Sequence, residues 1–202
     1  MSTSRKRDVL IIDSGGANLA SLQFALERLD ATVRISVDPA QILQADRLLL
    51  PGVGSAGDAM RRLYAAGLGA VIPGLRQPLL GICLGMQLLY RRTAEQHTDG
   101  LGVFDGEVTA LQAAPGLRVP HMGWNTLTRV APDPLLEGIS TADHFYFVHS
   151  YAAPAGPDSI GETMHGATFA AVARHENFWA TQFHPERSGS AGARLLRNFL
   201  EL

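Results

Sequence analysis

The only cysteine of this 202-residue chain lies between a strand-like run that enters a glycine and a helix-like run that leaves another. The segment reads Pro78-Leu79-Leu80-Gly81-Ile82-Cys83-Leu84-Gly85-Met86-Gln87-Leu88-Leu89. It has the Gly-x-nucleophile-x-Gly pattern of a sharp strand-to-helix turn, which lifts the central side chain clear of a sheet. A Cβ at either flanking glycine would collide with the turn or force a costly backbone conformation. We therefore expect a strand over 79–82, a helix over 84–92, and a sulfur near the helix N-terminus, where partial positive charge favours thiolate.

The first half of the chain alternates short apolar runs with helical patterns. This alternation predicts an α/β fold, with a mostly parallel sheet covered by helices on both faces. The expected strands cover 9–12, 32–37, 48–50 and 79–82, and the expected helices cover 18–29, 39–43, 56–66 and 84–92.

After residue 100 the pattern changes to short strand candidates separated by Gly and Pro, which predicts an antiparallel extension of the sheet. The candidates cover 103–104, 107–111, 124–130, 145–148, 169–173 and 178–183, and a helix over 192–200 follows. No linker or repeat divides the chain, so we expect residues 1–202 to form a single domain.

Composition excludes several classes of function. The formal net charge is −2, so nothing favours binding to nucleic acid or to an anionic membrane. The apolar run 9–12 is far shorter than the roughly 7–15 residues of a secretory signal core. No run approaches the roughly 20 apolar residues of a membrane span. A lone cysteine cannot form an internal disulfide and fits a reducing compartment, so we expect a cytoplasmic protein.

A candidate base lies about a hundred residues after the cysteine, in Gln182-Phe183-His184-Pro185-Glu186. Residues two apart at a strand end point to the same side, so Glu186 can align His184 while His184 faces Cys83. A cysteine nucleophile needs such a base and a group that fixes the orientation of the base. Alone, His-Pro-Glu could be a surface turn and Cys83 a buried structural thiol. Together the two motifs predict a catalytic Cys83, His184 and Glu186.

A second glycine-rich turn, Leu50-Pro51-Gly52-Val53-Gly54, follows a different strand. Loops at the carboxyl ends of parallel strands line the site in such folds. The backbone N–H groups of this turn could join that of Leu84 to hold an oxyanion, although a plain turn is the alternative. The remaining histidines have no metal-ligand spacing, and we predict no metal site and no cofactor. His149 reads as a core or rim histidine.

These motifs closely resemble those of the class I (triad) glutamine amidotransferases, and within that family the glutaminase subunits of histidine biosynthesis. The resemblance spans nearly the whole chain, from 12–19 to 192–199, and implies a flavodoxin-like α/β fold. The strand-to-helix turn around Cys83, which we call the elbow, and the His-Pro-Glu motif are shared by many amidotransferases. Three segments are more specific to the histidine pathway: 50–54, Pro120-His121-Met122-Gly123-Trp124-Asn125, and Phe145-Tyr146-Phe147-Val148-His149-Ser150-Tyr151.

The resemblance implies the following chemistry. Cys83 attacks the side-chain amide of L-glutamine, and the oxyanion rests on N–H groups of Leu84 and of the Gly52-Val53 loop. His184 protonates the departing ammonia, leaves a glutamyl thioester and then activates water, while Glu186 orients its ring. The α-amino and α-carboxylate groups of glutamine are expected to contact Gln87, Glu95 and Ser150, with the backbone at Gly52 and Tyr151.

Ammonia released into water would be lost as ammonium, so such subunits dock onto a synthase. The partner implied here is a (β/α)₈-barrel cyclase subunit that uses ammonia to form imidazole glycerol phosphate and AICAR. Positions matching the expected interface are Asn18, Met122, Trp124, Tyr146 and Arg187. The alternatives are a glutaminase for another biosynthetic synthase, a γ-glutamyl hydrolase or cysteine peptidase on the same fold, and a non-catalytic scaffold.

Overall fold

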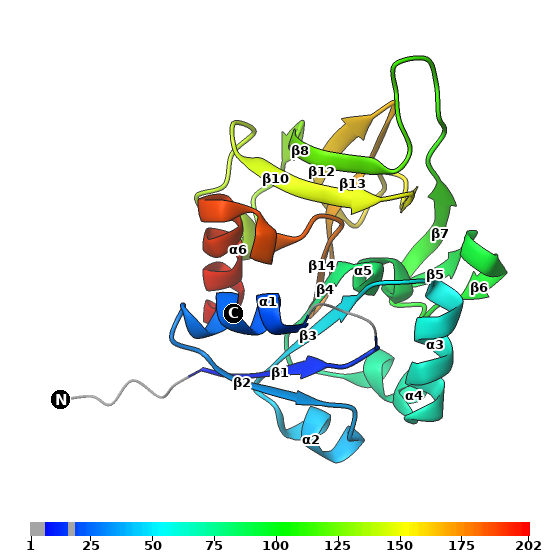
Figure 1. Cartoon of the computed structure of the whole chain (residues 1–202). Helices are drawn as coiled ribbons and strands as arrows, with labels where there is room; N and C mark the ends of the chain where they lie inside the picture. The colour runs from blue at the N-terminus through cyan, green and yellow to red at the C-terminus, as the bar shows by residue number, and fades with distance from the viewer. Residues whose placement is uncertain (1–6, 16–18) are drawn as a thin grey trace.

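The computed structural model describes residues 7–15 and 19–202. The largest sheet in these residues runs in the order β2-β1-β3-β4-β14-β13-β12-β9 (Figure 1). Neighbours from β2 to β14 pair in parallel, and neighbours from β14 to β9 pair antiparallel. The strands are β1 (Asp8–Ile12), β2 (Thr32–Ser36), β3 (Arg47–Gly52), β4 (Leu79–Cys83), β9 (Arg129–Val130), β12 (Ser159–His165), β13 (Ala167–His175) and β14 (Phe178–Thr181).

Helices cover both faces of the parallel part, as predicted. Alternate residues of β1 point to opposite faces: Val9 and Ile11 pack with α1 (Leu19–Glu27) and α6 (Gly189–Glu201). Leu10 and Ile12 pack in a second core with the other helices. Burial on both faces explains why residues 9–12 of β1 form a continuous apolar run. The other helices are α2 (Pro39–Gln44), α3 (Ala56–Ala65), α4 (Leu68–Val71) and α5 (Leu84–Leu89).

The antiparallel end of the main sheet, from β14 to β9, is the expected extension, and the described residues form two further, smaller sheets. One pairs β8 (His121–Thr126) with β10 (His144–His149). The other has the order β11 (Tyr151–Ala152), β7 (Phe104–Ala110), β5 (Tyr90–Thr93) and β6 (Thr98–Asp99). Short 3₁₀ turns are η1 (Ile72–Gly74), η2 (Glu95–His97), η3 (Pro134–Leu136) and η4 (Pro185–Arg187). None of the helices in the described ranges has the length and apolarity to span a membrane.

Several elements differ from the sequence prediction, among them α4, β6 and β11, which were not expected. The helix expected over 84–92 ends at Leu89, because the ring of Tyr90 packs 5.1 Å from that of Phe104 and the chain continues as β5 beside β7. The strand expected over 124–130 is divided between two sheets: β8 pairs with β10, and β9 pairs with β12. Strand β12 was not predicted, since its place in the sheet comes from pairing with β13.

Candidate active site

Cys83 ends β4 and immediately precedes α5, as the elbow motif predicts. Its backbone has φ 54° and ψ −110°, a conformation that costs energy in a residue with a side chain and that is concentrated at functional sites. Gly85 makes the turn possible, because a Cβ at this position would overlap the carbonyl oxygen of Leu50 in β3. The close contact of α5 with β3 therefore fixes where the sulfur lies.

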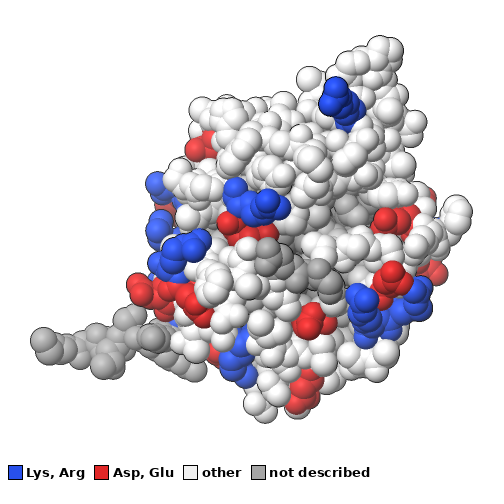
Figure 2. Space-filling view, viewed as in Figure 1, with Lys and Arg blue, Asp and Glu red and all other residues white. Residues whose placement is uncertain are grey.

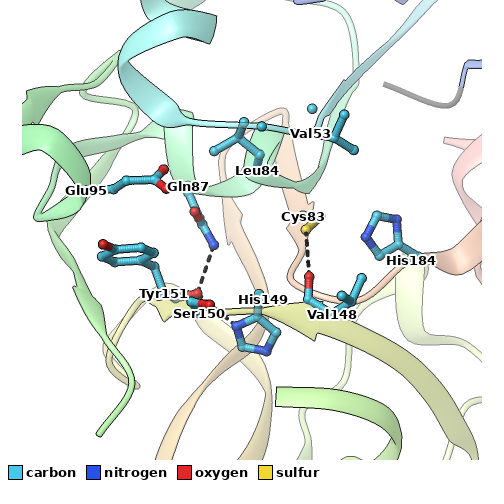
Figure 3. Close-up of a pocket in the computed structure, with 12 residues that line it drawn as sticks. Val53, Cys83, Leu84, Gln87, Glu95, Val148, His149, Ser150, Tyr151 and His184 are labelled. Carbon is cyan, nitrogen blue, oxygen red and sulfur yellow. Dashed lines mark hydrogen bonds between the residues drawn. The ribbon is translucent and has the colours of Figure 1, made fainter. Parts of the chain in front are cut away.

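A cleft of about 290 Å³ opens at the sulfur, at the carboxyl ends of β3 and β4 (Figure 3). It gathers the cysteine, the histidine and all of the residues predicted to bind glutamine. The lining residues are Gly52, Val53, Gly54, Cys83, Leu84, Gln87, Glu95, Val148, His149, Ser150, Tyr151 and His184.

His184 lies beside Cys83 and is held by Glu186. Its Nδ1 donates to Oε1 of Glu186 over 2.8 Å, and both side chains are nearly buried. A ring nitrogen faces the sulfur in Figure 3. Burial alone would lower the pKa of His184, but hydrogen bonds and charge interactions with Cys83 and Glu186 outweigh burial and raise the pKa to about 10. The site therefore favours an imidazolium next to the Cys83 sulfur.

Two further groups contact the sulfur, and sequence reasoning gave a role to neither. The carbonyl oxygen of Val148 lies 3.8 Å from Sγ on one side. The side-chain Nε2 of Gln182, which is fully buried, lies 3.8 Å from Sγ on another. The one sequence signal for Gln182 is its position two residues before His184.

The residues predicted to bind glutamine are anchored by hydrogen bonds within the cleft. Gln87 donates through Nε2 to the carbonyl of Tyr151 over 2.8 Å and to Oε1 of Gln182 over 3.1 Å. Glu95 accepts at Oε2 from the backbone N–H of Ala56, the first residue of α3, over 2.7 Å. Ser150 lines the same cleft between β10 and β11.

The glycine-rich turn lies against the start of α5. A Cβ at Gly52 would meet the Cβ of Leu84 at 3.1 Å, and Gly52 pairs directly with Cys83 between the strands. Gly54 has φ +94°, which favours glycine, and Val53 between them is partly exposed.

The predicted interface residues share one face near His184. Met122 and Trp124 on β8 are 64% and 56% exposed. The Trp124 ring meets the ring of Tyr146 edge to face at 5.9 Å. The Arg187 guanidinium lies 4.7 Å above the same Tyr146 ring. Asn18 lies outside the described residues.

Three histidines that sequence reasoning set aside also lie together. Nδ1 of His121 is 3.0 Å from Nε2 of His149, and the rings of His121 and His165 stack at 4.1 Å. Within residues 7–15 and 19–202, no group of three or more His, Cys, Asp or Glu side chains has an arrangement that could hold a metal ion.

The fold, the strained cysteine at the elbow and the adjacent His-Glu pair define a class I amidotransferase. The family model "Glutamine amidotransferase class-I" matches residues 10–202, and the chain belongs to this family. The HisH 1 subunit of imidazole glycerol phosphate synthase from Vibrio vulnificus (strain YJ016) is 48% identical, over 98% of this chain and 99% of that protein. HisH of Xanthomonas axonopodis pv. citri is 48% identical over 96% of this chain and 98% of that protein. This identity places the chain among the HisH subunits.

Solved structures agree on the fold. A putative GMP synthase protein from Thermoplasma acidophilum superposes with a TM-score of 0.76 at 19% identity, over 98% of this chain and 94% of that one. PurLQS from Thermotoga maritima superposes with a TM-score of 0.74 at 18% identity, over 98% of this chain and 99% of that one. The predicted α/β architecture with its antiparallel extension is therefore confirmed.

Proposed function

We propose that this chain hydrolyses L-glutamine to glutamate and ammonia through a thioester on Cys83, and supplies the ammonia to a (β/α)₈-barrel cyclase subunit of imidazole glycerol phosphate synthase. The observation that carries this proposal is the single cleft shared by Cys83 and His184, with Glu186 bonded to the far side of the imidazole. Similarity to HisH subunits over nearly the whole chain supports the same conclusion.

The residues can divide the reaction as follows. The Cys83 thiolate attacks the amide carbon of the glutamine side chain, and N–H groups of Leu84 and of the Gly52-Val53 turn stabilise the oxyanion. His184 gives its proton to the leaving nitrogen, so ammonia departs and a thioester remains. His184 then takes a proton from water, which attacks the thioester, and glutamate and the thiolate are regenerated. Glu186 keeps the ring oriented and stabilises its charge.

We assign the rest of the cleft to the amino-acid end of the substrate. The Glu95 carboxylate suits an α-amino group, since one of its oxygens is already held by the Ala56 N–H and the side chain lines the cleft. Gln87, Ser150 and the backbone at Gly52 and Tyr151 line the same space and offer polar groups for the α-carboxylate and α-amino groups.

A partner is needed to consume the ammonia before it becomes ammonium. The exposed Met122 and Trp124, together with Tyr146 and Arg187, offer an aromatic and cationic docking face close to His184. In this assignment the partner makes imidazole glycerol phosphate and AICAR. A nucleophilic thiol has to stay reduced, which supports a cytoplasmic location. The family match over residues 10–202 supports a single amidotransferase domain.

The test separates ammonia production from ammonia use. In a complex with the cyclase, Cys83→Ser and His184→Ala should lower glutamine-dependent synthesis at least about 10³-fold, because they remove the nucleophile and the base. Synthesis from added ammonium should remain within about twofold of wild type. The control is His144→Ala, which replaces an exposed histidine at the start of β10. Loss of both activities in an intact complex, or retention of glutamine-dependent synthesis, would contradict the proposal.

A further inference from the structure

A continuous chain of hydrogen bonds ends at the Cys83 sulfur, and its members Asn125, His121, His149 and Gln182 have no part in the mechanism above. Its members come from four separate stretches of the sequence, and the histidine and glutamine side chains in it are all buried. In order, the chain passes through Asn125, His121, His149, the carbonyl of Tyr151, Gln87, Gln182 and Cys83.

One backbone carbonyl sets the direction of every bond in this chain. The Tyr151 oxygen can only accept, and it lies 2.8 Å from Nδ1 of His149 and 2.8 Å from Nε2 of Gln87. Both neighbours must therefore donate to it. This requirement fixes the tautomer of His149 and the orientation of the Gln87 amide.

On the sulfur side, the orientation passes from one amide to the next. Nε2 of Gln87 has a second N–H, which points to Gln182 at 3.1 Å. Gln182 must present its oxygen there, so its amide nitrogen faces Cys83 at 3.8 Å. A flipped Gln182 would put two N–H groups together on one side and its oxygen against the sulfur on the other.

On the other side, the same logic reaches the surface. Because Nδ1 of His149 donates, its Nε2 accepts from Nδ1 of His121 at 3.0 Å, and Nε2 of His121 accepts from Nδ2 of Asn125 at 3.3 Å. Asn125 is held in this orientation independently, since its Oδ1 accepts from the Thr126 N–H at 2.8 Å and its Nδ2 donates to the carbonyl of Met164 at 3.0 Å. The orientation of Asn125 and the orientation set by the Tyr151 carbonyl therefore require the same donor-to-acceptor direction along the chain.

Both histidines are neutral at neutral pH, as this polarity requires. Burial is the main cause that lowers the pKa of His121 to about 3 and the pKa of His149 to about 4. Each ring therefore has one N–H to donate and one bare nitrogen to accept.

The surroundings of the sulfur explain why this polarity matters. A thiol can donate to the Val148 carbonyl, but a thiolate is repelled by that oxygen at 3.8 Å. A hydrogen bond from an N–H to an ionised acceptor is stronger than a hydrogen bond from the same N–H to a neutral acceptor. We infer that Gln182 stabilises the Cys83 thiolate by N–H donation, and that the buried chain from Asn125 holds its amide in the donating orientation. This inference deepens the proposed function, on which the catalytic use of the thiolate rests.

The single cysteine makes the test direct, because alkylation of the full chain by iodoacetamide reports on Cys83 alone. Gln182→Met keeps a long unbranched side chain and removes the donor. We expect alkylation about tenfold slower at pH 7.5, since a hydrogen bond to a charged group is lost. In the complex with the cyclase, kcat for glutamine hydrolysis should fall about 10- to 100-fold with KM changed less than about threefold.

The matched control is Gln77→Met, at the opposite end of β4, where the amide donates to the carbonyl of Ile42. Gln77→Met should leave the rate of alkylation and kcat for glutamine hydrolysis unchanged. If alkylation and kcat of Gln182→Met stay within twofold of wild type, the inference is overturned. A wild-type complex that releases no ammonia from glutamine would contradict the proposed function. In that case, slower alkylation of Gln182→Met would still support the role of Gln182.

A second variant tests the role of Gln182 even if Gln182→Met does not fold. Gln87→Met removes the donor that holds Oε1 of Gln182, and the Gln87 amide donates to Gln182 and to the Tyr151 carbonyl, not to the sulfur. Alkylation should slow about threefold, because the Gln182 amide loses one of the bonds that orient it. A role for these amides in packing alone predicts no change in alkylation, and that result would overturn the inference.

Discussion

At the scale of single residues, the reactive centre combines a strained backbone with a charged pair. The positive φ of Cys83 is held by β4 before it and α5 after it. His184 shares a hydrogen bond with Glu186 and faces the sulfur, which raises the pKa of His184 against the effect of burial. The orientation of the cysteine comes from the fold, and the charge of the histidine beside it comes from the neighbours of that histidine.

The neutral histidine pair makes the fold sensitive to acid. Histidines in an unfolded chain have a pKa near 6.5. Burial, together with the neighbouring His165, holds the pKa of His121 at about 3 and of His149 at about 4. At pH values between the folded and the unfolded pKa of each histidine, the unfolded chain binds a proton that the folded chain does not. This contribution to the free energy of unfolding is therefore complete above about pH 6.5. It decreases as the pH falls below that value, by no more than about 1.4 kcal/mol per pH unit for each histidine, and is fully lost once the pH has fallen through about 4 for His149 and about 3 for His121.

Urea unfolding at pH 7.5, 6.0 and 5.0 measures this effect. We expect wild type to lose stability more steeply than His121→Asn, which keeps a donor at the Nδ1 position and has no basic group. His144→Asn replaces an exposed histidine and should follow the wild-type slope. Equal slopes for wild type and His121→Asn would show that the buried pair does not govern acid unfolding.

At the scale of elements, the site depends on how closely α5 packs against β3. Gly85→Ala places a methyl group against the Leu50 carbonyl, and neither backbone can move without disturbing the elbow. We expect a loss of about 3 kcal/mol or more in the free energy of unfolding, at the upper end for overpacking. Gly74→Ala, where a Cβ meets nothing, should change it by less than about 1 kcal/mol. Denaturant midpoints compare the two, and similar values would refute the packing argument.

The central strands of the parallel half could be predicted because they are buried on both faces. The runs 9–12 and 48–50 are apolar at every position, so their strand character is visible without knowledge of their neighbours. Strand β12 has no such signal: it contains Gly161 and polar residues, and it is a strand because it pairs with β13 across the turn at Gly166. The end of α5 is likewise set by the contact of Tyr90 with Phe104.

The same distinction holds for the site. Cys83, His184 and Glu186 lie in local motifs whose spacing implies their geometry, and the structure brings the three together. The contacts of Gln182 and His149 have no local pattern. Gln182 meets Gln87 across 95 residues of sequence, and His149 meets His121 across 28. Such partners become visible only when the sheets are assembled.

At the scale of the whole molecule, the β8–β10 sheet links the cleft to the proposed docking face. Its β10 strand ends in the segment that lines the cleft, and its β8 strand exposes Met122 and Trp124. The surface around β8 and β10 is mostly uncharged in Figure 2, whereas acidic and basic side chains are interspersed lower on the same face. An exposed aromatic surface with Arg187 at Tyr146, beside the reactive centre, suits a partner that receives ammonia.

Trp124 should be a principal contact for that partner. Its ring is 56% exposed, yet it is supported edge to face by Tyr146, and such pre-ordered aromatic side chains contribute most of the affinity at interfaces. Trp124→Ala should weaken binding to the cyclase by a factor of about ten or more in titration calorimetry. Leu43→Ala removes a side chain of similar exposure, 60%, from α2 beyond the other edge of the main sheet, and should leave the affinity unchanged. Equal affinities for the two variants would move the docking face away from β8. Because the same sheet lines the cleft, a partner seated on Trp124 would lie next to the place where ammonia is released.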